Sequence, residues 1–306
     1  MTSSSEPAPI SGAEAPKLTP IGLWWAGARP KTLGVAFAPV LVGTAAGALG
    51  ASVIWTRALA ALVVSLALQI GVNYANDYSD GVRGTDKDRR GPVRLVASGL
   101  ASATAVRNAA IISFMVAAVV GAALSLAVNP WLLLIGLAAI IAAVTYTGGP
   151  KPYGYFGLGE LMVLAFFGVV ATVGSAYVQY QRLPAEAWWG ALVVGLPAVG
   201  ILLANNVRDV ASDVVAGKRT LAVRIGAPRA RLLYVACLVG ALLAVVACGV
   251  LHPWSFIALA AAPLAVTPAR LVRTRSDPPS LVAALIRTVR FQLALSVLLA
   301  LGLRLG

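Results

Sequence analysis

Long apolar runs without charged residues divide most of this chain of 306 residues. A hydrocarbon core about 30 Å thick requires about 20 apolar residues in a helix that rises 1.5 Å per residue. Nine such runs lie near 33–50, 58–76, 108–128, 131–147, 161–181, 187–206, 232–251, 254–269 and 281–303. The ninth contains Arg287 and Arg290 near its start, where long side chains can reach the headgroups. The pattern predicts an all-α, polytopic membrane protein with nine transmembrane helices.

The positions of the basic residues predict its orientation. Cytoplasmic loops of membrane proteins carry an excess of Lys and Arg. With the N-terminus inside, 21 of the 24 basic residues fall on the cytoplasmic side, and only Arg57, Arg182 and Arg304 fall outside. A wrong number of spans would scramble this alternation. The net charge of +13 is therefore a topology signal, and since the basic residues form no recognition motif we expect no nucleic-acid partner.

The composition agrees with this architecture. Apolar residues make up 59% of the chain and charged residues 11%, which excludes an ordinary soluble domain. Residues 1–20 are rich in Ser, Pro and Ala and contain no apolar run, so we expect a disordered cytoplasmic tail before a single domain at 21–306. The abundance of Ala, Gly, Val and Arg is typical of a GC-rich bacterial genome, which favours a bacterial plasma membrane.

Acidic residues are few and clustered. There are eleven, and six of them lie between 77 and 88 or between 209 and 213. In the first acidic segment, 73–86, Asn76 and Asp80 are four residues apart and would share a helical face. Gly81 and Gly84 would then break the helix, which lets the chain turn Asp86 back toward Asp80.

The second acidic segment, 205–213, repeats this arrangement. Asn205, Asp209 and Asp213 occupy successive turns of one helical face. Both segments contain an N-x3-D pattern and lie at the cytoplasmic ends of the second and sixth predicted spans. The two halves of the chain therefore resemble a diverged internal repeat.

Acids at a membrane boundary are energetically costly unless they are compensated. Salt bridges to neighbouring basic residues in solvated loops are one compensation, but paired asparagines gain nothing from them. Carboxylate and amide oxygens without His or Cys favour Mg2+ over zinc or copper. Mg2+ would also neutralise a diphosphate and make it a better leaving group. We therefore predict Mg2+ as cofactor, with Asp80, Asp86, Asp209 and Asp213 as catalytic residues and with Asn76, Asp80, Asp86, Asn205, Asp209 and Asp213 as metal ligands.

Basic residues surround both segments and are predicted to hold the departing diphosphate as charge-assisted donors. Each of them also suits a role in membrane topology. The predicted diphosphate ligands are Arg83, Lys87, Arg94, Lys218 and Arg219.

These motifs resemble the UbiA superfamily of intramembrane aromatic prenyltransferases, across residues 29–305. The family's first motif corresponds to Asn76, Asp80 and Asp86, and its second to Asn205, Asn206, Asp209 and Asp213. The spacing in NDYSDGVRGTD is similar to the branch that acts on 1,4-dihydroxy-2-naphthoate rather than to the shorter NDxxDxxxD of hydroxybenzoate enzymes. The stretches RPKTL, GPVRLVASG, YTGGPKPYGYFGLGE and AGKRTLAVRIG resemble that branch too.

The resemblance implies nine helices around a central cavity that faces the cytoplasm. It implies transfer of a polyprenyl chain from polyprenyl diphosphate to dihydroxynaphthoate with loss of carbon dioxide, and hence menaquinone synthesis. Another aromatic acceptor, 4-hydroxybenzoate or homogentisate, is the alternative.

The acceptor must meet an allylic cation in a space that excludes water. Tyr146 and Tyr153 could contribute π faces, and Lys151, the lone cation of its loop, could meet an acceptor carboxylate. With Asn206 they form the predicted acceptor-binding set. A topology role for Lys151 and an interfacial role for the tyrosines are the alternatives.

Two other classes of membrane protein fit the sequence less well. A transporter of an anionic amphiphile would place its polar residues in the middle of the spans, whereas here they lie at the ends. A CDP-alcohol phosphotransferase motif begins at DYSDGVR, but the Arg that this motif requires does not follow Gly84.

Overall fold

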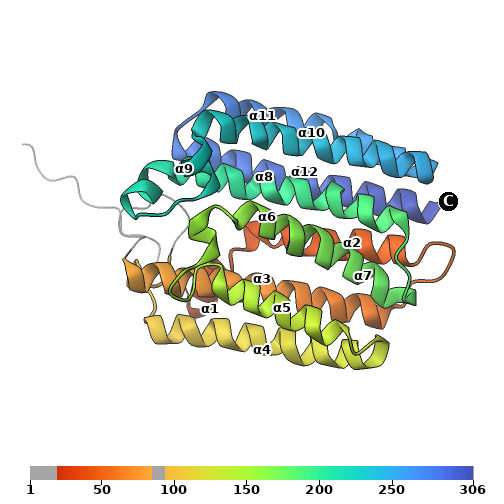
Figure 1. The fold of residues 1–306 in the computed structure, drawn as a ribbon, viewed down its shortest axis with the longest axis horizontal. Helices are drawn as coiled ribbons and strands as arrows, with labels where there is room; N and C mark the ends of the chain where they lie inside the picture. The colour runs from red at the N-terminus through yellow and green to blue at the C-terminus, as the bar shows by residue number, and fades with distance from the viewer. Residues whose placement is uncertain (1–18, 85–93, 306) are drawn as a thin grey trace, which may run out of the picture.

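The computed structural model describes residues 19–84 and 94–305, and within them the chain is a bundle of roughly parallel and antiparallel helices (Figure 1). The elements of its first half are α1 (Pro20–Ala28), η1 (Pro30–Thr32), α2 (Gly34–Gly47), α3 (Trp55–Arg83), α4 (Ala103–Val128) and α5 (Leu132–Thr145). Those that follow are η2 (Tyr153–Phe156), α6 (Gly159–Val163), the π-helical η3 (Leu164–Val170), α7 (Ala171–Tyr180), α8 (Ala185–Val215), α9 (Leu221–Ile225), α10 (Ala227–Leu251), η4 (Pro253–Ala261), α11 (Pro263–Thr274) and α12 (Pro278–Leu305).

Every one of the nine predicted apolar runs is occupied by helix, but their lengths differ. Six helices are long and apolar enough to cross a membrane: α3, α4, the continuous Gly159–Tyr180, α8, α10 and α12. A seventh crossing exists if η4 and α11, which meet at a 46° bend, form one broken span. Helices α2 and α5 have 14 residues each, or about 21 Å at 1.5 Å per residue. The all-helical prediction is confirmed, and nine crossings stay a prediction.

An additional short helix precedes the first predicted span. Thr19 accepts a hydrogen bond from the Gly22 N–H at 3.1 Å, and Pro20 occupies the first turn, as is common at helix starts. The helix ends at Arg29, which adopts a left-handed conformation with φ of 56°. This turn carries Arg29 and Lys31 to the rim of the interior cavity.

Small residues allow the helices to approach closely. A Cβ added at Gly43 of α2 would lie 2.1 Å from the carbonyl oxygen of Thr172 in α7, and one at Gly47 would lie 2.2 Å from that of Ala176. In lipid, close backbone packing of this kind is a main source of helix association. The glycines thus fix α2 against α7, beside the core formed with α8, α10 and α12.

Two of the three basic residues predicted to lie outside stabilise helix ends. Arg57 donates to the carbonyl oxygens of Val178 and Gln179, at 2.9 and 2.8 Å, at the end of α7. Arg304 donates to the carbonyls of Ala48 and Ala51, after α2. Arg57 therefore satisfies carbonyl groups that a helix end leaves without partners, and Arg304 connects the end of α12 to the turn after α2.

Candidate active site

A cavity of about 1730 Å³ lies between the two halves of the bundle. Helix α3 continues through most of the first acidic segment and α8 through all of the second, so their Asn and Asp residues keep the helical spacing predicted from sequence. Gly84, with φ of 70°, ends α3 as a left-handed cap. Both segments line the one cavity, to which they contribute Asn76, Asp80, Asn205, Asp209 and Asp213.

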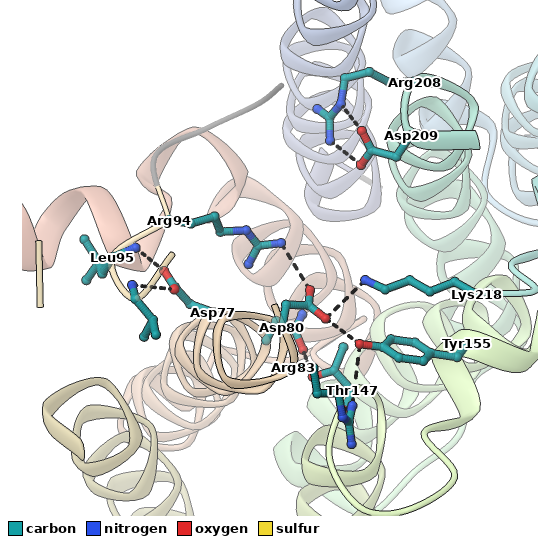
Figure 2. Close-up of polar contacts among 12 residues, drawn as sticks. Asp77, Asp80, Arg83, Arg94, Leu95, Thr147, Tyr155, Arg208, Asp209 and Lys218 are labelled. Atoms are coloured by element: carbon teal, nitrogen blue, oxygen red, sulfur yellow. Dashed lines mark hydrogen bonds and ion pairs between the residues drawn. The ribbon is translucent and has the colours of Figure 1, made fainter. Parts of the chain in front are cut away.

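The carboxylate of Asp80 is contacted from several separate segments of the chain (Figure 2). It is 3% exposed. Its Oδ1 accepts from the Tyr155 hydroxyl at 2.5 Å and from Lys218 Nζ at 3.1 Å, and its Oδ2 lies 3.6 Å from Arg94 Nη2. Lys218 follows the second acidic segment by a few residues and lies 138 residues from Asp80. This pair therefore ties the two halves of the chain together, and its positive charge offsets the burial of the carboxylate.

Asp209 forms a bidentate pair with its own neighbour. Arg208 Nε and Nη2 lie 2.7 and 2.8 Å from the two oxygens of the Asp209 carboxylate (Figure 2). One turn further on, Asp213 Oδ2 accepts from the Thr220 hydroxyl at 3.4 Å. The second segment thus presents two buried carboxylates along one helical face.

The loop between α5 and α6 closes over the first segment. The Thr147 hydroxyl donates to Asn76 Oδ1 at 2.7 Å. Arg83 donates to the carbonyl oxygens of Thr147 and Gly149, and its guanidinium lies 5.5 Å from the Tyr155 ring centroid. Arg83 is therefore directed at this loop and is not among the residues that line the cavity.

The predicted acceptor residues separate into two groups. Tyr146 and Tyr153 line the cavity and pack edge to face, with ring centroids 5.5 Å apart, and burial raises the pKa of Tyr153 to about 12. Asn206 also lines the cavity and donates to Glu160 Oε1 at 2.8 Å. Lys151 is exposed and does not border the cavity.

The other predicted diphosphate ligands are similarly divided. Arg94 and Lys218 line the cavity, whereas Arg219 is exposed outside it. Asp86 and Lys87 lie outside the described residues.

Several residues of the site were not predicted from sequence. Asp77 is 1% exposed, and its carboxylate accepts from the backbone N–H groups of Leu95 and Val96 at 2.8 and 3.1 Å. The position of Asp77 directly after Asn76 could have indicated this role. Consecutive residues of a helix point about 100° apart, so Asp77 does not share the helical face of Asn76. Other polar groups at the cavity that were not predicted include Arg29, Lys31, Thr147, Tyr155 and Arg208.

The donor set of the cavity fits a hard divalent cation. Three carboxylates and four asparagine carboxamides line it, and their oxygens are ligands that Mg2+ accepts. Among the residues that the structure describes, no group of three His, Cys, Asp or Glu side chains lies close enough to hold a metal ion. Side chains of the cavity thus provide oxygen donors in both halves, while Arg208 and Lys218 neutralise two of them.

A helical membrane bundle whose two halves bring acidic segments to one interior cavity defines an integral membrane transferase. The chain belongs to the UbiA prenyltransferase family, whose model matches residues 36–295. It is 48% identical to the 1,4-dihydroxy-2-naphthoate octaprenyltransferase of Mycobacterium tuberculosis, over 82% of this chain and 86% of the relative. It is 40% identical to the enzyme of the same name from Escherichia coli, over 92% and 95% of the two chains.

Solved structures share the fold. A UbiA homologue from Aeropyrum pernix has a TM-score of 0.67 at 15% identity, covering 90% of this chain and 97% of the other. A UbiA homologue from Archaeoglobus fulgidus bound to DMAPP and Mg2+ has a TM-score of 0.59 at 16% identity, covering 90% and 98%.

Proposed function

We propose that this chain transfers a polyprenyl group from polyprenyl diphosphate to 1,4-dihydroxy-2-naphthoate, with loss of carbon dioxide, giving demethylmenaquinone and diphosphate. The names of the bacterial relatives support the reaction and the acceptor. The observation that carries the proposal is the meeting of both N-x3-D segments in one cavity.

The oxygen donors of both segments would hold Mg2+. They are Asn76, Asp80, Asp86, Asn205, Asp209 and Asp213. The Archaeoglobus homologue bound to DMAPP and Mg2+ supports Mg2+ as the cation. When bound there, Mg2+ would neutralise part of the diphosphate charge. The diphosphate would then leave the allylic carbon more easily.

The basic residues of the cavity bind the diphosphate in this proposal. Arg94, Lys218 and Arg208 already lie against carboxylates at the cavity wall, so they can donate to phosphate oxygens at the same place. Arg83 and Arg219 remain predicted diphosphate ligands, although neither of them borders the cavity. Lys87, which lies outside the described residues, remains a predicted ligand too.

The apolar part of the cavity holds the hydrocarbon and keeps water away from the cation. Its walls include Val64, Leu68, Leu124 and Phe167. A volume of about 1730 Å³ exceeds the roughly 300–1000 Å³ of common small-molecule pockets, as a long prenyl chain together with a bicyclic ring requires. The acceptor ring lies beside Tyr146 and Tyr153, and Lys151 stays the predicted partner of its carboxylate.

We also propose a bacterial plasma membrane, with the N-terminus and the active site on the cytoplasmic side. The excess of basic residues at the end where α3 and α8 finish supports this orientation. Nine crossings would require α2 and α5 to span as short helices and η4 with α11 to form one bent span.

The decisive assay supplies the purified protein with polyprenyl diphosphate, Mg2+ and, separately, dihydroxynaphthoate, 4-hydroxybenzoate and homogentisate, and measures prenylated lipid and released diphosphate. We expect product with dihydroxynaphthoate, and none after removal of Mg2+. Asp80→Asn and Asp209→Asn should abolish turnover while the exposed-acid control Asp277→Asn keeps it. Preferred turnover of another acceptor would overturn the assigned substrate, and active forms of both cavity variants would overturn the metal assignment.

A further inference from the structure

Glu160 is a buried acid that the proposed chemistry leaves unused. It begins the span Gly159–Tyr180 and is 5% exposed. Its Oε1 accepts a hydrogen bond from Asn206 Nδ2 at 2.8 Å, and its Oε2 has no hydrogen-bond partner within the described residues. A buried carboxylate oxygen without a partner is unfavourable in an apolar surrounding, so an apolar residue at this position would pack at lower cost. The bond to Asn206 is therefore the feature that requires an explanation.

That bond fixes which end of the Asn206 side chain meets the cavity. A carboxamide has one donor end and one acceptor end, and an ionised carboxylate can only accept. Glu160 therefore accepts from the Nδ2 end of the Asn206 side chain, and the Oδ1 end takes no part in this bond. Asn206 lines the cavity, and in the described part of the chain no hydrogen bond is made to its Oδ1. Asn206 thus presents a hydrogen-bond acceptor.

The same corner of the cavity is aromatic. The Tyr146 ring lies against Gly159, the residue before Glu160, since a Cβ there would be 3.4 Å from its Cε2. Tyr146 packs edge to face with Tyr153, and both line the cavity. The cations that suit a diphosphate, Arg94 and Lys218, instead contact Asp80. Asn206 bonds to Glu160, the residue after Gly159, so its carboxamide belongs to this corner of the cavity as well.

We propose that Glu160 is a positioning residue for the aromatic acceptor, an inference that rests on the proposed function. Glu160 holds the Asn206 carboxamide so that Oδ1 accepts a hydrogen bond from a ring hydroxyl of that acceptor. It selects hydroxylated rings and does not act on the prenyl diphosphate.

The test uses the full-length protein in lipid vesicles and measures KM for each substrate separately. Glu160→Leu removes the acceptor of the Asn206 bond, and we expect KM for dihydroxynaphthoate to rise about tenfold while KM for the prenyl diphosphate changes less than twofold. Glu160→Gln keeps an oxygen that can accept from Nδ2, so it should restore most of the affinity. Asn206→Ala should reproduce the effect of Glu160→Leu. Glu186→Gln, at the start of α8, is the control for loss of an acid elsewhere.

A second measurement separates orientation from general damage. Wild-type protein should discriminate between dihydroxynaphthoate and its two monohydroxy analogues, and Glu160→Leu should lose that discrimination for one of them. Equal changes in both KM values, or an unchanged acceptor KM in Asn206→Ala, would overturn the assignment of Glu160. If the wild-type protein prenylates no aromatic acceptor, the proposed function is refuted instead. The role of Glu160 can then still be tested by the binding of dihydroxynaphthoate alone, measured by quenching of tyrosine and tryptophan fluorescence.

Discussion

Replacing Lys218 by Met tests the contact that joins the two halves of the site. The Nζ of Lys218 lies 3.1 Å from Asp80 Oδ1 and 4.6 Å from the Tyr155 ring centroid, and the side chain is 9% exposed. At this distance, two unit charges attract by roughly 5 kcal/mol for an effective dielectric constant of about 20. The Lys218→Met variant loses this attraction and leaves Asp80 buried.

The expected loss of stability is smaller than the gross attraction. Removing one partner of a buried ion pair typically destabilises by about 3–5 kcal/mol, because the other charge remains without compensation. Asp80 keeps Arg94 at 3.6 Å and the Tyr155 hydroxyl at 2.5 Å. We therefore expect Lys218→Met to lower the free energy of unfolding, measured in detergent, by about 2–3 kcal/mol. The double variant Lys218→Met with Asp80→Asn should recover part of this loss, since it removes the stranded charge.

Activity should change as well. A hydrogen bond to a charged group contributes about 1.5–3 kcal/mol, so losing Lys218 as a diphosphate donor should lower kcat/KM for the prenyl diphosphate roughly 10- to 100-fold. Arg219→Met should have a smaller effect, because Arg219 is exposed beside the cavity, and Arg270→Met on α11 is the control for loss of a remote cation. The reasoning would be refuted if the losses of unfolding free energy in Lys218→Met and Asp80→Asn simply added up in the double variant. It would also be refuted if Arg270→Met lowered kcat/KM as much as Lys218→Met.

Three further changes test the frame around the cavity. Asp77→Ala removes the acceptor of two backbone bonds, so we expect a loss of about 2–4 kcal/mol in the free energy of unfolding and, because Arg94 precedes Leu95, a higher KM for prenyl diphosphate. Gly43→Ala forces α2 away from a carbonyl 2.1 Å from the new Cβ and should destabilise by about 1–3 kcal/mol, whereas Gly136→Ala, with open space around it, should not. Burial raises the pKa of Tyr153 from 10 to about 12. The fold favours the neutral phenol, so its contribution to stability is complete below pH 10 and is lost between pH 10 and about 12. The phenolate absorbance of wild type minus that of Tyr153→Phe measures this titration.

The sequence predicted the helices and the meeting of the two acidic segments because both depend on local patterns. Apolar runs fix helices in a membrane, and residues four apart share a helical face wherever the helix continues. Asn76 with Asp80, and Asn205 with Asp209, keep that relation in α3 and α8. Their shared end of the bundle follows from the alternation of basic loops.

The remainder of the site depends on contacts between distant parts of the chain. Tyr155 and Thr147 reach Asp80 and Asn76 only because the loop after α5 folds over α3, which no local pattern specifies. The direction of Arg83 is set by carbonyl groups of that same loop. Its position in the sequence, next to the acids, was therefore a poor guide to what it contacts.

The two acidic segments also share a relation that the N-x3-D pattern alone does not describe. Asp77 and Asn206 occupy the same place in the two repeats, one residue after the asparagine that faces the cavity. Each is rotated about 100° around the helix axis from that asparagine, and Asn206 still borders the cavity whereas Asp77 does not. Asp77 holds the backbone at Leu95, and Asn206 bonds to Glu160. The position after each asparagine therefore connects its helix to a neighbouring segment, and the acids of the site stay aligned because the helices that carry them are anchored there.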